Sequence, residues 1–160
     1  MHRYPSILVA MALTATVASA ALAQESTDAM GGMSAVSAKS VTFADIAVPG
    51  FDPGMKIAVI DGNPDGTGPY TLRLSFPAGY RFPPHFHPNA ENLTVLSGTF
   101  LLAMGDRVDD SKLQAYGVGD YLHLPATKPH FGGARDATVV QLHGQGPFKI
   151  SLAQTAAGSR

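Results

Sequence analysis

Cysteine is absent from this 160-residue chain, and that absence excludes several kinds of chemistry. Without a thiol, the protein has no disulfide, no zinc–thiolate site and no cysteine nucleophile. It also has no cysteine to which a lipoprotein anchor could be attached. Any catalysis must therefore use other residue types.

Charged residues are also few. They make up 14% of the chain, and the net charge is −1. Nucleic-acid-binding proteins usually show a basic stripe, so this composition argues against a nucleic-acid partner. A glycine-rich phosphate loop of the right form is missing, and no serine lies in an elbow or triad context.

The N-terminus resembles a secretory signal. A positive charge at Arg3 precedes a mostly apolar run at 7–17, and Ala21–Ala23 fits a cleavage motif. The apolar run is shorter than the roughly 20 residues that span a bilayer, which disfavours a membrane anchor. We therefore predict a periplasmic or secreted protein without a membrane partner, with these segments: signal peptide 1–23, disordered linker 24–40, one folded domain 41–152 and tail 153–160.

Long helical patterns are missing from the predicted domain, whereas glycine and proline interrupt short apolar runs throughout. Tyr70–Phe76 alternates apolar and polar side chains, as a half-buried strand does. About ten short strands separated by turns indicate an all-β sandwich or barrel. The predicted strands cover 41–48, 55–60, 70–76, 85–87, 91–96, 99–104, 113–116, 121–124, 137–142 and 148–152.

Two histidines and a glutamate form the candidate site. His85 and His87 are two residues apart, and Glu91 has the same parity. Alternate residues of an extended chain point to one side, so the three side chains can converge. Imidazole and carboxylate suit a divalent transition metal such as Fe, Mn, Ni, Cu or Zn, although a polar cluster without metal would show the same pattern.

The spacing of this stretch resembles the cupin family. The first cupin motif, G-x5-H-x-H-x3-E-x6-G, is matched from Gly79 to Gly98 without a mismatch. The second motif, G-x5-P-x-G-x2-H-x3-N, resembles the stretch from Gly119 onward. That stretch departs from the motif at Thr127, in place of glycine, and at Ala134, in place of asparagine.

The resemblance implies a fold and a ligand set. The expected fold is the cupin double-stranded β-helix, a conical antiparallel β-barrel, as a single domain. The metal would be bound by His85, His87, Glu91 and His130. Glu91 would also be the catalytic proton acceptor, as in some family members. The unexpected Thr127 suggests a differently shaped turn before His130.

The pocket around the site is less well defined by sequence. The parity of the strand residues predicts an apolar cavity over the site. We expect Arg81 near the mouth of this cavity, where it would either pair with an anionic substrate or remain in solvent. Alternation turns His123 and His143 outward, but a bulge near Gly144 could bring His143 to the pocket. The full list of pocket candidates is Phe76, Arg81, Phe82, Leu93, Val95, Leu102, Met104 and His143.

Two hypotheses about function remain open. The first is a metal-dependent oxidoreductase, dioxygenase-like, that acts on a small oxygen-rich organic substrate, with isomerase or lyase chemistry as variants. The second is a non-catalytic module that binds a metal or a small ligand. A homodimer is plausible through an outward sheet face that includes Leu96 and Leu101.

Overall fold

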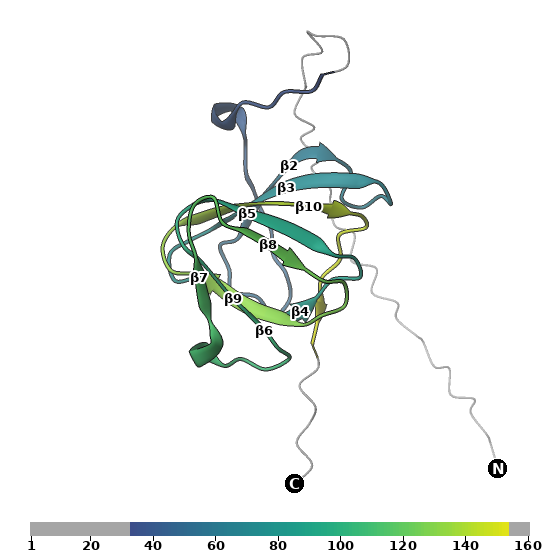
Figure 1. The fold of residues 1–160 in the computed structure, drawn as a ribbon. Helices are drawn as coiled ribbons and strands as arrows, with labels where there is room; N and C mark the ends of the chain where they lie inside the picture. The colour runs from purple at the N-terminus through teal and green to yellow at the C-terminus, as the bar shows by residue number, and fades with distance from the viewer. Residues whose placement is uncertain (1–32, 154–160) are drawn as a thin grey trace, which may run out of the picture.

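The computed structural model describes residues 33–153 as two antiparallel sheets that face each other (Figure 1). The six-stranded sheet has the order β1-β2-β3-β10-β5-β8, and the five-stranded sheet has the order β11-β4-β9-β6-β7. The strands are β1 Ala44–Asp45, β2 Lys56–Gly62, β3 Pro69–Phe76, β4 Arg81–Phe86, β5 Glu91–Ser97, β6 Phe100–Met104, β7 Gln114–Tyr116, β8 Tyr121–Leu124, β9 His130–Ala134, β10 Thr138–Gln145 and β11 Ser151–Leu152. Two 3₁₀ turns complete the fold: η1 Ala38–Ser40 and η2 Asp110–Lys112.

Alternation along the strands builds the core between the sheets. In β3 the side chains of Tyr70, Leu72, Leu74 and Phe76 are buried, and the intervening side chains are only half-buried. Full burial of one leucine or phenylalanine side chain contributes about 1.5–3 kcal/mol. The all-β barrel architecture predicted from the sequence is therefore confirmed.

Strand register brings distant parts of the sequence to one place. In the β4–β9 pair, His85 lies directly opposite His130. In the other sheet, β10 lies between β3 and β5, and Gly144 pairs with Glu91. The two sheets thus bring both motif regions to one end of the barrel.

Strand β9 has no counterpart among the predicted strands. Its sequence, HFGGA, contains two glycines and does not alternate, yet all five residues are buried. A Cβ atom on Gly132 would lie 2.0 Å from the backbone oxygen of Leu101, and one on Gly133 would lie 2.0 Å from that of Tyr80. The glycines let three backbones approach closely, so they mark a central strand here and not a break.

The start of the folded region also differs from the prediction. Within the predicted strand 41–48, only Ala44–Asp45 pairs with β2. Ile46 and Val48 instead pack against the core from the segment between β1 and β2. The predicted linker ends in the 3₁₀ turn η1, which the Ser37 side chain caps.

The other predicted segments lie mostly at residues that the structure does not describe. The predicted signal peptide, 1–23, lies wholly outside the described residues, as does most of the tail. Within residues 33–153, no helix has the length and apolar character needed to cross a membrane.

Thr127 occupies the motif position at which a glycine was expected. Its φ angle is +61°, in the left-handed region that glycine adopts most readily. The Thr127 N–H donates to the His87 backbone oxygen at 2.8 Å, so this turn is hydrogen-bonded to the stretch that carries the first motif. The turn therefore has a glycine-like conformation at a β-branched residue, and the expected change of shape is not needed.

Replacing Thr127 by glycine should stabilise the protein slightly. Relief of left-handed strain is worth about 1–2 kcal/mol, and the greater freedom of glycine in the unfolded chain offsets up to about 1 kcal/mol. We expect an increase of up to about 1 kcal/mol in the free energy of unfolding, measured by urea denaturation. Thr127→Ala is the control, because it removes the hydroxyl but keeps the Cβ; equal stabilisation by both variants would contradict the strain argument.

Candidate metal centre

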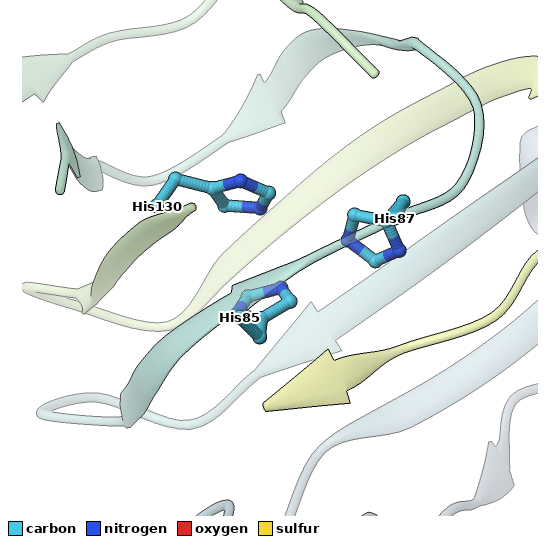
Figure 2. Close-up of side chains that lie close together, drawn as sticks. All are labelled: His85, His87 and His130. Carbon is cyan, nitrogen blue, oxygen red and sulfur yellow. The ribbon is translucent and has the colours of Figure 1, made fainter. Parts of the chain in front are cut away.

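Three buried histidines converge at one end of the barrel. His85 lies in β4, His87 follows directly after it, and His130 begins β9. One ring nitrogen from each lies within 4.8 Å of the others. Figure 2 shows the three rings turned toward a common space. The separation suits three ligands of one metal ion.

Backbone carbonyls orient all three rings. The Nδ1–H groups donate to the oxygen of Pro83 at 2.9 Å for His85, of Lys149 at 2.8 Å for His87 and of Lys128 at 3.1 Å for His130. Because a carbonyl can only accept, each Nδ1 must be the donor, and each Nε2 keeps its lone pair for a ligand. Such outer-shell bonds are usual for metal-binding histidines.

A short sequence pattern accompanies two of these bonds. His85 and His130 each bond the carbonyl two residues earlier, and a proline, Pro84 or Pro129, lies between. Proline fixes its own φ and favours extended backbone at the residue before it. This X-Pro-His pattern is visible in the sequence at both histidines, and it favours the backbone that keeps the two rings in their bonded orientation.

Glu91 lies beside the three rings. Its Oε1 atom is 3.3 Å from His87 Nε2, and its side chain is 3% exposed. Oε1 has no hydrogen-bond partner in the structure. Burial raises the pKa of the Glu91 carboxyl to about 8. A buried carboxylate oxygen without a partner is costly, and a cation at this point would remove the cost.

The pKa values of the three histidines are shifted downward, opposite to that of Glu91. Burial, followed by the charge of His130, lowers the pKa of His85 to about 3 and that of His87 to about 4. Burial also lowers the pKa of His130. Near neutral pH the three imidazoles are therefore neutral, the state in which imidazole binds metal.

An irregularity in β4 shapes the cavity above these groups. Strict alternation would put Phe82 and His85 on opposite sides of the strand, but the β4–β9 register shifts between them. Both side chains therefore line one cavity of about 50 Å³. The ring centroids of Phe82 and His85 are 5.3 Å apart.

Four half-buried cavity residues outside the strands were not predicted. Ile46 and Phe51 come from the segment between β1 and β2, and Phe148 and Ile150 come from the segment between β10 and β11. All four are half-buried, so we call them the mouth of the cavity. Phe148 stacks on His87 with ring centroids 5.2 Å apart, and Phe51 meets His85 edge-on at 4.9 Å. Of the predicted strand 148–152, only Ser151–Leu152 pairs in a sheet, so Phe148 and Ile150 reach the cavity from an irregular segment.

The predicted pocket residues divide into two groups. Phe76, Phe82, Leu93 and Leu102 line the cavity. Val95 is buried in the core but does not line it. The parity argument works where a strand alternates regularly and runs the length of the barrel.

Three predicted pocket residues lie elsewhere. Met104 ends β6 and is 46% exposed, because Leu102 and Ala103 are both buried and alternation fails there. Arg81 lines a separate hollow and pairs with Asp110 at 2.5 Å. His143 is exposed, as simple alternation predicts, and the register shift between β10 and β5 lies at Val139 and Val140, away from it. His123 is likewise exposed and bonds Asn92.

The donor set fits a divalent transition metal. Three neutral imidazoles present free Nε2 atoms, and Glu91, whose raised pKa keeps it protonated near neutral pH, would supply a negative charge once a bound cation displaced its proton. Imidazole and carboxylate together suit Fe, Mn, Ni, Cu or Zn. His85, His87 and His130, with Glu91, would hold the ion.

Comparisons with known proteins agree with this geometry. The family model described as "Cupin domain" matches residues 72–142. A search of curated proteins gives no match. Solved structures with a similar fold include the polyketide cyclase RemF from Streptomyces resistomycificus, a putative acetylacetone dioxygenase from Methylibium petroleiphilum and a cupin-2 domain from Rhodospirillum rubrum.

These similarities extend over most of each chain. RemF has 19% identity and a TM-score of 0.64 over 78% of this chain and 88% of its own. The putative dioxygenase has 14% identity and a TM-score of 0.61, over 81% of this chain and 86% of its own. The cupin-2 domain has 16% identity and a TM-score of 0.60, over 77% of this chain and 82% of its own. Identities this low establish a shared fold and leave the reaction open.

Proposed function

We propose that this chain, which carries a cupin domain at residues 72–142, is a metal-dependent enzyme, dioxygenase-like, that acts on a small organic substrate. The observation that supports this most is the set of three free Nε2 atoms and one partnerless carboxylate oxygen beneath an open apolar cavity. A site that only stores metal needs no such cavity. A bound metal would supply a Lewis acid and, for redox-active ions, electron transfer to O₂.

The residues have distinct roles in this proposal. His85, His87 and His130 would hold the ion, with their rings oriented by their carbonyl bonds. Glu91 would be a further ligand and could also accept a proton from the substrate, because its Oε1 has no hydrogen-bond partner in the protein. The aromatic mouth excludes water from the reacting atoms, which strengthens electrostatic interactions inside.

A test compares metal forms of the purified protein. Iron, manganese, nickel and copper forms are assayed for oxygen consumption with β-diketones, small diols and flavonols. We expect turnover with one metal and a fall in kcat of at least about 100-fold in Glu91→Gln, the loss typical of a missing proton acceptor. Asp61→Asn, at an exposed carboxylate, is the control and should leave kcat unchanged.

A non-catalytic binding module remains the second candidate. It is favoured by one observation: among the described residues, the cavity wall has no ionisable group other than the three histidines and Glu91. Tight metal binding without turnover of any of these substrates would support the module and contradict the enzyme.

A further inference from the structure

The chemistry of the cavity wall restricts what can bind there. Apart from His85, His87, Glu91 and His130, every residue that lines the cavity is aliphatic, aromatic or methionine. The wall therefore has no hydroxyl, amide or additional charged side chain. A ligand oxygen away from the four polar groups would be buried without a partner, which weakens binding by roughly tenfold or more for each such oxygen.

The wall that surrounds the ligand body is aromatic and closely packed. The rings of Phe76, Phe82 and Phe100 contact one another, with centroids 5.9–6.3 Å apart. Leu93 and Leu102 add aliphatic surface. Burial of hydrocarbon here is favourable, and these side chains have no flexible polar end that could turn in to meet a polar ligand.

The mouth is apolar as well. Phe51 and Phe148 lie against the rings of His85 and His87, and Ile46 and Ile150 accompany them. Arg81, the cation once expected here, is engaged with Asp110 in a different hollow. A carboxylate that projects from the ligand would therefore meet no positive side chain among the lining residues.

The cavity is also small. Its volume of about 50 Å³ accommodates roughly four water-sized groups. The ion and the ligand atoms bound to it would take part of that space, so the ends of even a five-carbon ligand would extend into the mouth. A bulky or multiply hydroxylated ligand would exceed both the space and the supply of hydrogen-bonding partners.

We propose that this site selects a small ligand whose oxygen donors lie together at one end and whose remaining body is hydrocarbon, as in a short 1,3-diketone. The proposal rests on the proposed function, because the oxygen donors bind at the metal centre. It replaces the expectation of an oxygen-rich substrate: the oxygens face the histidine cluster, and the hydrocarbon faces the phenylalanines and leucines.

The test uses two chelators of matched reach. Pentane-2,4-dione and malonate each offer two oxygens across a three-carbon unit, but malonate carries two further charged oxygens where the dione has methyl groups. Dissociation constants are measured on the full chain loaded with Co(II), by visible absorption. Each dissociation constant is divided by that of the same ligand with aqueous Co(II), which removes the ligand's intrinsic affinity for the ion. The ratio of the two quotients is the corrected preference. We expect the corrected preference for the dione to be at least about tenfold.

A paired substitution separates local from global charge. Ile150→Lys places an ammonium at the half-buried mouth and should reduce the corrected preference for the dione by about tenfold, since malonate then gains a partner. Val118→Lys adds the same charge at an exposed residue that does not line the cavity. It should leave the preference unchanged.

A metal-free arm tests the wall without the ion. Xenon, which binds small dry apolar cavities, should cause saturable NMR shifts of the Leu93 and Leu102 methyl groups. Failure to load Co(II) together with xenon binding would overturn the proposed metal function and support the apolar site. Normal Co(II) loading with a corrected preference for malonate, or absence of xenon binding, would overturn the substrate class and leave the metal function in place.

Discussion

Alanine at position 130 is expected to weaken metal binding by at least about 100-fold while the barrel still folds. His130 supplies one of only three imidazoles at the centre, and loss of a mere outer-shell partner already costs about 10–100-fold in affinity. The fold should persist, because the hydrogen bond from the ring is a local one to the Lys128 carbonyl. Competition with a chromophoric chelator measures the affinity, and circular dichroism monitors the fold.

A matched control is available in the same chain. His123 is exposed on β8, outside the centre, and its ring bonds Asn92. His123→Ala removes the same chemical group and should leave metal affinity within about threefold of the unmodified protein. Equal weakening by both variants, or retained affinity in His130→Ala, would contradict the assignment of the centre.

The metal-free protein should be most stable near pH 6.5. In the folded protein the pKa values of the three histidines lie below the usual 6.5. Below pH 6.5 these histidines therefore become protonated in the unfolded chain while they stay neutral in the folded chain. Each histidine then costs about 1.4 kcal/mol of stability per pH unit. Stability should therefore fall steeply as the pH drops from 6.5 toward 4.

Glu91 lowers the stability of the metal-free protein above pH 6.5. Its folded pKa of about 8 lies above the reference 4.5, so the unfolded chain releases a proton that the folded chain retains. The resulting cost increases with pH up to about 8. Between pH 4.5 and 6.5 three histidines outweigh one carboxyl, and above 6.5 the carboxyl acts alone. We expect a fall of roughly 2 kcal/mol from pH 6.5 to 8.

Urea unfolding at a series of pH values, with chelator present, measures this profile. Glu91→Gln should abolish the alkaline fall and keep the acid one, whereas His130→Ala should reduce the acid slope by about a third. Adding a divalent metal should raise stability and remove the alkaline fall, because the ionised carboxyl then has a partner. A flat metal-free profile between pH 6.5 and 8 would show that Glu91 is not desolvated as the structure indicates.

Regular alternation explains where prediction from sequence worked. Tyr70–Phe76 and Tyr121–Leu124 have period-two patterns, and both form strands at or within one residue of the predicted bounds. The pattern fails at β9, where close backbone contact selects glycine, and at Met104, where a strand ends in solvent. Both failures depend on neighbours from other parts of the chain.

The fold class and the spacing of the four candidate ligands could be predicted from the sequence alone. Parity and motif spacing are local properties that survive folding, so they could be recognised without a structure. The groups that surround those ligands became evident only from the folded chain. The register of the β4–β9 pair places His130 opposite His85. The register shift in β4 directs the side chains of both Phe82 and His85 into one cavity, and two irregular segments form the mouth of that cavity. These contacts join residues far apart in the chain, so the apolar lining of the cavity forms only when the barrel closes.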